Sequence, residues 1–304
     1  MNVLVIYSTQ TGQLKDIVHH FTADLRDKAS IDFAEIRLVR PYAFPWTAQR
    51  FFDVMPEAVL QIPEPIHPMP EILEKDYDLV IFAYQPWFLS PSIPTSSFLR
   101  SEWAQVLRGK KVVTLIGCRN MWLNGQEKVK ADLQALGAEL IGNIVLEDRH
   151  GNLTSLRTTI NWLFSGKKQA GNAPEAGVSR QDMDGSRAYG RIVYEAVAAG
   201  REAGLQGELL QAGALQLHPG LVLLEKRGGS RYPVWANRAR SLGAQGTPER
   251  LKVIRKFQRL LMMNIFVLSP LVGPLARGLA RMKESRMADE MAYFKGVSYK
   301  AGMM

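Results

Sequence analysis

The sequence predicts an α/β protein with a doubly wound, five-stranded parallel sheet and a mainly α-helical C-terminal region. Two observations lead to this prediction. Short apolar runs recur through the first 150 residues, and helical patterns of apolar side chains lie between them. Strands that alternate with helices favour a parallel sheet covered on both faces. The predicted strands are residues 3–7, 31–38, 78–84, 111–117 and 140–146.

The helices of this sheet are predicted from apolar residues at helical spacing. Residues 11–28 carry four such side chains on one face, namely Leu14, Val18, Phe21 and Leu25. Further helices are expected over 97–107, 124–136 and 153–164, and Gly109 and Gly137 indicate helix ends.

The chain divides into three parts by composition. Residues 1–167 are expected to form the sheet domain, and the polar stretch 168–185 is interpreted as a linker because it contains Gly and Pro and has no periodicity. Residues 186–304 form a helical, basic C-terminal region, which either builds a substrate tunnel or faces a membrane. Its helices are predicted over 186–204, 207–217, 233–242, 248–268 and 274–295.

Charge is distributed unevenly along the 304 residues, whose formal net charge is +9. Residues 1–168 hold 18 basic and 18 acidic side chains, whereas residues 169–304 hold 20 basic and 11 acidic ones. The basic part indicates an anionic membrane surface, an acidic protein or nucleic acid as partner. Nucleic acid is the weakest of these, because surface aromatics and a recognition motif are missing from the sequence. The single cysteine excludes a disulfide framework and a multi-cysteine metal site.

The first predicted strand ends in a hydroxyl-rich loop that leads into a helix. Ser8, Thr9 and Thr11 supply hydroxyl groups, and Gly12 allows a ligand to approach the backbone. The helix that follows offers free N–H groups and the positive end of its dipole to an anion. The loop has no Lys, which excludes a Walker P-loop, so a monophosphate fits better than a triphosphate. The alternative is an ordinary Ser/Thr cap of a helix.

This loop resembles the phosphate loop of the flavodoxin superfamily, T/S-x-T-G-x-T, with Leu14 in place of the last Thr. The resemblance implies a flavodoxin-like fold and FMN as cofactor. It also implies that the phosphate is held by Ser8, Thr9, Gln10, Thr11, Gly12, Gln13 and Leu14.

Two more loops follow predicted strands and correspond to those that flank the isoalloxazine ring in the superfamily. The first loop, "QPWFLSPSIP", contributes Pro86, Trp87, Phe88 and Leu89. The second loop contributes Gly117, Cys118, Arg119, Asn120, Met121 and Trp122. Aromatic side chains bury a flat ring well, although ordinary core packing is the alternative. Arg119 is the only charge in these loops, which favours two-electron chemistry over single-electron transfer.

Four stretches resemble a narrower group, the flavodoxin-like proteins of dialkylresorcinol biosynthesis, known as "dialkylrecorsinol condensing enzyme". They are "LVIYSTQTGQLKDIV", "PYAFPWTAQRFFDVMPEAVLQIP", "DLVIFAYQPWFLSPSIPTSSFL" and "VVTLIGCRNMWLNGQEKVK". Condensation needs a thiolate with His partners, whereas Cys118 has no His near it in sequence and reads better as a core thiol. The resemblance also implies aromatisation of a 2,5-dialkylcyclohexane-1,3-dione, for which FMN would accept the hydride.

Three residues are candidates for the chemistry of that step. Arg119 could hold an enolate, and His150 or Tyr84 could act as base. Two other functions stay open: an NAD(P)H:quinone reductase, and an electron carrier or binding module without its own substrate.

The stretch 260–276 has 17 residues without a charge, between basic flanks. It is too short and too interrupted by Pro and Gly to span a bilayer, so it is a core helix, an interfacial anchor or the wall of an alkyl-chain tunnel. The expected partners are a hydrophobic small molecule and either an anionic membrane or an acidic acyl carrier protein; a homo-oligomer stays open. No signal peptide is recognised, so the expected location is the cytoplasm or its membrane surface.

Overall fold

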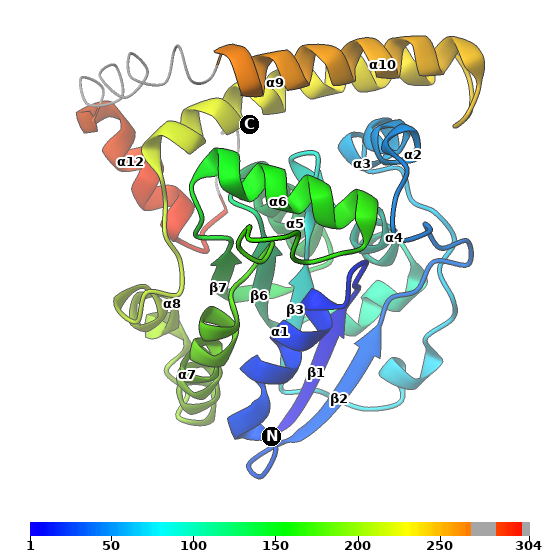
Figure 1. Ribbon diagram of the computed structural model, residues 1–304. Helices are drawn as coiled ribbons and strands as arrows, with labels where there is room; N and C mark the ends of the chain where they lie inside the picture. The colour runs from blue at the N-terminus through cyan, green and yellow to red at the C-terminus, as the bar shows by residue number, and fades with distance from the viewer. Residues whose placement is uncertain (269–283, 300–304) are drawn as a thin grey trace.

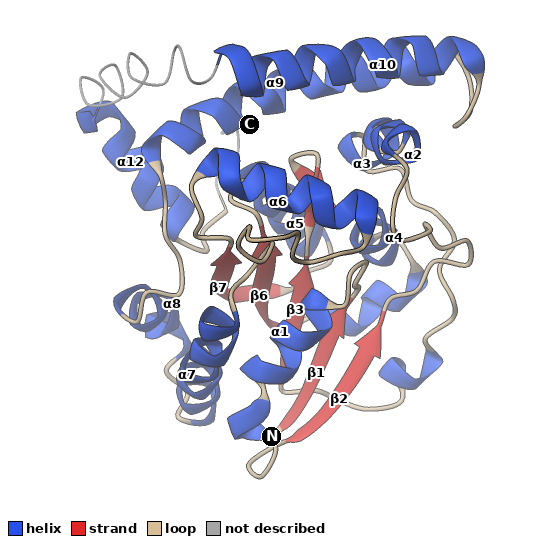
Figure 2. Ribbon diagram, viewed as in Figure 1, coloured by secondary structure: helices blue, strands red, loops and turns tan. Residues whose placement is uncertain are grey.

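The computed structural model describes residues 1–268 and 284–299. Five parallel strands form one sheet in the order β2-β1-β3-β6-β7, which confirms the predicted strands and the flavodoxin-like α/β fold (Figure 2). The order reverses beside β1, so the carboxyl ends of β1 and β3 are the place where such sheets hold ligands. The bounds are β1 (Asn2–Tyr7), β2 (Ser30–Glu35), β3 (Leu79–Tyr84), β6 (Lys111–Cys118) and β7 (Glu139–Glu147).

The central strands are apolar on both faces because both faces are covered. All six residues of β3 are buried, and so are the six between the first and last residues of β6. One hydrophobic core lies under α4 (Ile93–Leu99) and α5 (Leu123–Ala135), and the other lies under α1 (Gln13–Phe21). A parallel sheet with this much burial reads as continuous apolar runs in the sequence.

Two predicted helices are shorter than expected. The helix predicted over 11–28 ends at Phe21, where Thr22 Oγ1 donates to Val18 O at 2.7 Å, and a 3₁₀ turn (Ala23–Leu25) continues from there. The helix predicted over 97–107 divides into α4 and a 3₁₀ helix (Glu102–Leu107), with Ser101 Oγ bonded to Phe98 O at the break. Local hydroxyl–carbonyl bonds of this kind compete with helix continuation.

Several short elements near residue 50 and residue 88 escape the periodicity analysis. They are α2 (Ala48–Asp53), α3 (Met55–Val59) and a two-stranded hairpin made of β4 (Pro86–Trp87) and β5 (Ser90–Pro91). Thr47 caps α2, since its Oγ1 accepts from the backbone N of Arg50 at 3.3 Å. Elements of two to six residues are too short to give a periodic signal.

The predicted linker ends earlier than residue 185. Helix α7 (Arg180–Ala198) begins after Ser179, whose Oγ accepts from the backbone N of Asp182 at 3.0 Å. A Cβ on Gly190 would collide with Phe21 O, so only glycine lets α7 cross α1 this closely. Helix α7 and α8 (Glu202–Gln211) share the hydrophobic core of α1, so these helices pack on the sheet itself (Figure 1).

The remaining helices lie above the carboxyl ends of the strands (Figure 1). They are α6 (Asn152–Ser165), α9 (Pro219–Arg240) and α10 (Pro248–Met263), with α12 (Glu284–Lys295) beside α5. Helix α9 begins 14 residues before the predicted start and runs through Pro233. Its first half is held against α5 by two hydrogen bonds between Glu225 and Asn124.

The apolar stretch 260–276 is only partly described. Residues 260–263 end α10, a π-helical turn covers Asn264–Leu268, and residues 269–276 lie outside the described residues. Met263 and Phe266 are 46% and 44% exposed. Within residues 1–268 and 284–299, none of the helices combines the length and apolarity that crossing a bilayer requires.

Candidate functional site

The loop after β1 leads directly into the N-terminus of α1, and it is called the anion cradle below for its predicted role. Gly12 has a φ of 87°, in the left-handed region that favours glycine. Its backbone N–H donates to Thr9 Oγ1 at 3.0 Å, and Thr11 Oγ1 lies 3.5 Å from the backbone N of Gln13. A Cβ on Gly12 would meet no other heavy atom within 4 Å, so the space beside it is open. Hydroxyls, a helix N-terminus and open space are what a phosphate group needs.

The side chains of Gln10 and Gln13 hold neighbouring segments of the chain. Gln13 Oε1 accepts from the backbone N of Val178 and Gln13 Nε2 donates to Val178 O, both at 3.1 Å. Gln10 Nε2 donates to Tyr42 O at 3.0 Å. The side-chain amides at these two positions therefore bond to other parts of the chain.

Leu14 and Gly117 form a packing contact and not a ligand contact. Leu14 is fully buried in the core below α1. A Cβ on Gly117 would lie 3.1 Å from both Leu14 Cδ1 and Ile17 Cδ1, so glycine lets α1 approach the end of β6. The inclusion of the Leu14 side chain among the phosphate-binding groups is therefore corrected. Ser8 is buried at the start of the loop.

Helix α6 crosses above the carboxyl edge of the sheet (Figure 1). Its N-terminal Asn152 bonds to the loop after β6, and near its other end Leu163 O accepts from the backbone N of Trp46 at 2.8 Å. Gly166, just beyond α6, lies against Pro45. The chain then returns to Gln13 through the Val178 bonds described above. Helix α6 therefore covers the carboxyl edge of the sheet from the loop after β6 to the segment around Trp46, and it is called the roof below.

The half-buried guanidinium of Arg119 lies at the N-terminus of α6. Arg119 Nη1 donates to Asn152 Oδ1 at 2.8 Å and to Asn152 O at 3.2 Å, and Asn120 Nδ2 donates to the same Oδ1 at 3.0 Å. No ion pair of Arg119 is found among residues 1–268 and 284–299. Burial lowers the pKa of Arg119, while the nearby Cys118 and Asp148 act in the opposite direction. A half-buried cation without a salt bridge has donors left for an anionic ligand.

Several polar atoms of the loops after β6 and β7 and of α6 are buried and have no hydrogen-bond partner among the described residues. They include Asn120 Oδ1, Asp148 Oδ2 and Ser155 Oγ, the last on α6. Buried polar atoms are normally paired, and unpaired ones indicate a bound polar group or water. Asn120 Oδ1 and Asp148 Oδ2 can only accept, so this corner fits the N–H group of a ligand or a water molecule as the missing donor.

His150 lies between β7 and α6 and is paired with a buried carboxylate. Its Nδ1 is 2.7 Å from Asp148 Oδ1, which also accepts the backbone N–H of His150 at 3.0 Å. The Asp148 side chain is fully buried, whereas that of His150 is 37% exposed. This pairing holds the Nδ1–H tautomer and leaves Nε2 as the basic nitrogen. The role of His150 as a base stays a prediction.

Trp87 and Phe88 belong to the first of the two loops that are predicted to flank the flavin ring, and they pack near α2. Phe88 and Leu89, with φ values of 49° and 60°, form the tight turn of the β4–β5 hairpin. The Phe88 ring lies 4.9 Å from that of Phe51, and the Trp87 ring lies 5.8 Å from that of Trp46. These side chains are half-buried and, together with α2, line one side of the carboxyl edge of the sheet. Pro86 lies in β4 of the same hairpin.

Three predicted site residues belong to the core or its border. Trp122 is 2% exposed and packs in the core of α5. Tyr84 is fully buried, and its hydroxyl donates to Gln126 Oε1 at 2.7 Å, which does not support its role as a base. Burial raises the pKa of the Cys118 thiol, so the thiol stays protonated and the core-thiol interpretation is favoured. Met121 remains half-buried in the loop.

Helix α9 packs against the two loops that are predicted to flank the flavin ring, a contact that the sequence pattern did not predict. Glu225 Oε1 accepts from the backbone N of Asn124 at 2.8 Å, at the N-terminus of α5, and Asn124 Nδ2 donates to Glu225 O at 3.0 Å. A Cβ on Gly228 would collide with Leu89, and one on Gly229 would lie 2.6 Å from Asn124 Oδ1. The Gly-Gly pair inside a helical stretch is the signal that could have revealed this close contact.

Glu225 is expected to make stability depend on pH. Burial raises its pKa to about 7, although hydrogen bonds from Asn124 and its neighbours act against the shift. The folded state therefore holds this proton more tightly than the unfolded state, so wild type should lose stability as pH rises from about 4.5 to about 7. Glu225→Gln replaces the titrating carboxyl group by a neutral amide. The free energy of unfolding of the variant, relative to that of wild type, should therefore increase by about 3 kcal/mol as pH rises from about 4.5 to about 7.

Urea denaturation of both proteins at pH 5, 6, 7 and 8 measures this difference. Glu290→Gln is the control, because Glu290 forms an exposed pair with Lys226. A difference between Glu225→Gln and wild type that stays constant with pH would contradict the assignment.

Solved structures resemble this fold, whereas no protein-family model and no curated protein matches the sequence. A candidate flavoprotein from Bacteroides eggerthii DSM 20697 is 18% identical over 53% of this chain and 97% of its own, with a TM-score of 0.39. A flavoprotein in complex with FMN from Lactobacillus acidophilus NCFM is 14% identical over 47% and 92%, with a TM-score of 0.37. A WrbA-like flavodoxin from Agrobacterium tumefaciens is 11% identical over 65% and 98%, also with a TM-score of 0.37. At these scores the fold assignment rests on the strand order of the sheet.

Proposed function

We propose that this chain binds FMN at the carboxyl edge of its sheet and is a flavin-dependent oxidoreductase. The observation that carries the proposal is the open anion cradle at Gly12, on the same edge of the sheet as the unpaired guanidinium of Arg119. The phosphate would be held by the Thr9 and Thr11 hydroxyls and the N-terminus of α1. Arg119 and Asn120 would face the polar edge of the ring system. FMN, when bound, supplies an acceptor for two electrons and one hydrogen.

The proposed substrate is a hydrophobic cyclic dione, a 2,5-dialkylcyclohexane-1,3-dione that becomes a resorcinol. The roof formed by α6 and the close packing of α9 favour a reaction shielded from water, which an electron carrier does not need. Trp87, Phe88 and Met121 offer apolar contacts for such a ring. An NAD(P)H:quinone reductase is the alternative that shares this cofactor.

Two residues have assigned roles in the proposed reaction. Aromatisation removes two hydrogens from the dione, one as a proton and one with the electron pair that the cofactor accepts. His150 Nε2 would take the proton, since Asp148 stabilises the imidazolium that forms. Arg119 would stabilise the enolate oxygen before and during that transfer.

Anaerobic mixing of FMN-loaded protein with the dione tests the proposal. Wild type should lose the absorbance of oxidised flavin and form an equal amount of resorcinol. Arg119→Ala should slow this reaction about 100- to 1000-fold, the usual effect of removing one preorganised donor, with a smaller effect on FMN affinity. Arg157→Ala is the control, because this exposed arginine is also close to the site in sequence, on α6.

Two outcomes would contradict the proposed oxidation of the dione. Flavin that is unchanged by the dione but is reduced by NADH and reoxidised by a quinone would indicate the quinone reductase. Flavin that reacts with neither substrate would indicate a carrier or binding module.

A further inference from the structure

Helices α9 and α10 form an outer layer of the molecule above the carboxyl edge of the sheet (Figure 1). Residues 219–268, which contain both helices, hold ten basic and two acidic side chains, an excess of eight within a net charge of +9. Positive charge at this density attracts anionic surfaces across the screening length of about 10 Å at 0.1 M salt.

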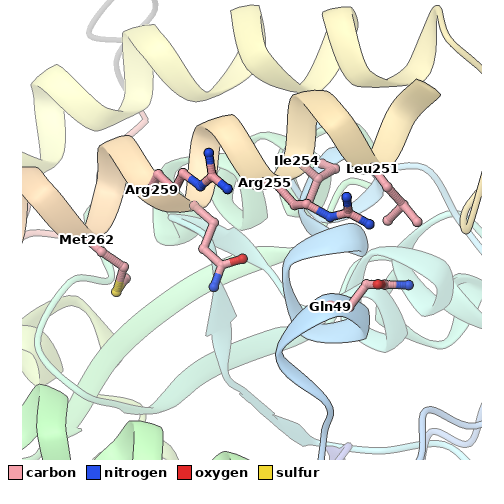
Figure 3. Close-up of a pocket in the computed structure, with 7 residues that line it drawn as sticks. Gln49, Leu251, Ile254, Arg255, Arg259 and Met262 are labelled. Atoms are coloured by element: carbon pink, nitrogen blue, oxygen red, sulfur yellow. The ribbon is translucent and has the colours of Figure 1, made fainter. Parts of the chain in front are cut away.

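Most of these cations are exposed and have no acidic partner. Four of the ten form ion pairs. Figure 3 shows two of the others, Arg255 and Arg259, extending from α10 on the side where Gln49 of α2 lies. Within residues 1–268 and 284–299, the exposed cations of this layer without an ion pair or a side-chain hydrogen bond are Arg227, Arg231, Arg238, Arg255, Lys256 and Arg259.

Apolar side chains are exposed on the same helices as these cations. Met263 lies one turn beyond Arg259 at the end of α10, and Phe266 follows in the π-helical turn; they are 46% and 44% exposed. On α9, Val234 is 67% exposed and lies three residues after Arg231. Residues three or four positions apart share one face of a helix, so cations and apolar side chains lie next to one another on both helices.

The cations of α10 face away from the core that holds the helix in place. Ile254 and Phe257 are 1% and 4% exposed and belong to a hydrophobic core shared with α9. Lys256 and Arg259 each lie two positions after one of these residues, which is slightly more than half a helical turn. The packing of the buried face therefore fixes the direction in which the basic face of α10 points.

We propose that the exposed faces of α9 and α10 bind the surface of an anionic lipid membrane. The six unpaired cations contact the lipid headgroups, and Met263 and Phe266 enter the boundary between headgroups and acyl chains. A bilayer offers an anionic surface with an apolar layer directly beneath it. It therefore matches neighbouring cations and apolar side chains better than the surface of an acidic protein does. The proposal is independent of FMN binding.

Flotation of the purified full-length protein with lipid vesicles tests this proposal. Vesicles that contain equal amounts of phosphatidylglycerol and phosphatidylcholine should carry the protein at about 0.1 M salt, whereas vesicles of phosphatidylcholine alone should not. Binding should be lost in about 1 M NaCl, where the screening length falls to about 3 Å.

Two variants separate the contribution of charge from that of the apolar side chains. The combined variant Arg255→Gln, Lys256→Gln and Arg259→Gln should weaken vesicle binding about 100-fold, since each cation near an anionic surface contributes a factor of about five. The combined variant Met263→Ser and Phe266→Ser should weaken it about tenfold, because two half-exposed apolar side chains no longer leave water.

Both variants have a matched control at the opposite end of the sheet. The combined variant Arg26→Gln, Lys28→Gln and Arg108→Gln removes three exposed cations from the segments that precede β2 and β6. Leu73→Ser removes an apolar side chain that is 46% exposed. Each control should change vesicle binding less than threefold.

The thermal melting temperature of each variant checks that folding is unchanged, and FMN titration of the same variants should match wild type. Equal flotation with vesicles of phosphatidylcholine alone, or unchanged flotation of the triple α10 variant, would overturn the proposal. Binding of poly-glutamate without flotation on phosphatidylglycerol vesicles would also overturn it and would indicate an acidic protein as partner.

Discussion

Replacing Arg250 by methionine is expected to destabilise the protein by about 3–5 kcal/mol, the usual cost of breaking a buried ion pair. Arg250 is 1% exposed. Its Nε donates to Asp53 Oδ1 at 2.7 Å, and its Nη1 and Nη2 donate to the two carboxylate oxygens of Glu57 at 2.8 and 2.6 Å. The variant would leave both carboxylates buried without their main partner.

This ion-pair cluster joins α10 to α2 and α3 beside the hydrophobic core that these helices share, so local detachment of α10 should accompany the loss of stability. Urea denaturation measures the free energy of unfolding, and limited proteolysis within residues 241–247 reports detachment. Lys252→Met is the matched control, because its pair with Glu249 is exposed on both sides and should contribute less than about 1 kcal/mol. A loss below 1 kcal/mol in Arg250→Met, with unchanged proteolysis, would show that the cluster does not hold α10.

Replacing Gly12 by aspartate is expected to weaken FMN binding at least a hundredfold, or about 3 kcal/mol. The substitution places a negative charge beside the proposed phosphate, and it puts a side chain at a φ of 87°. Thr11→Val, which removes one hydroxyl, should have a smaller effect of about tenfold. Flavin fluorescence quenching gives the affinity of each variant.

A glycine far from the site provides the control for Gly12→Asp. Gly109 has a φ of 68° and open space around a Cβ, so Gly109→Asp introduces the same charge and similar backbone strain. It lies at the opposite end of β6 from the proposed site. If both aspartate variants bind FMN with the affinity of wild type, the phosphate does not bind to this loop.

The sheet was predictable because it is encoded locally, and the anion cradle, which stays a prediction, is also a local pattern. Each central strand is a continuous apolar run, and Thr9, Thr11 and Gly12 are adjacent in sequence. The pattern also predicted helices at α5 and α6 to within about two residues, the usual uncertainty of helix boundaries.

The sequence pattern could not place α6 and α9 beside the predicted site, since their positions depend on contacts between residues far apart in the sequence. Asn152 meets Arg119 across 33 positions, and Glu225 meets Asn124 across 101. Trp122 was assigned to the ring site because it follows a strand, yet the core of α5 takes its side chain. Position in a loop does not determine which way an aromatic side chain turns.

The most direct test of the central claim is an absorption titration of the purified wild-type protein with FMN. The proposed cofactor site predicts one FMN per chain, with a shifted flavin absorption band and quenched fluorescence, and competition by inorganic phosphate at high concentration. Riboflavin, which lacks the phosphate, should bind at least tenfold more weakly. A flavin spectrum that does not change at any FMN concentration, or equal affinity for FMN and riboflavin, would contradict the claim that this sheet edge is a phosphate-anchored flavin site.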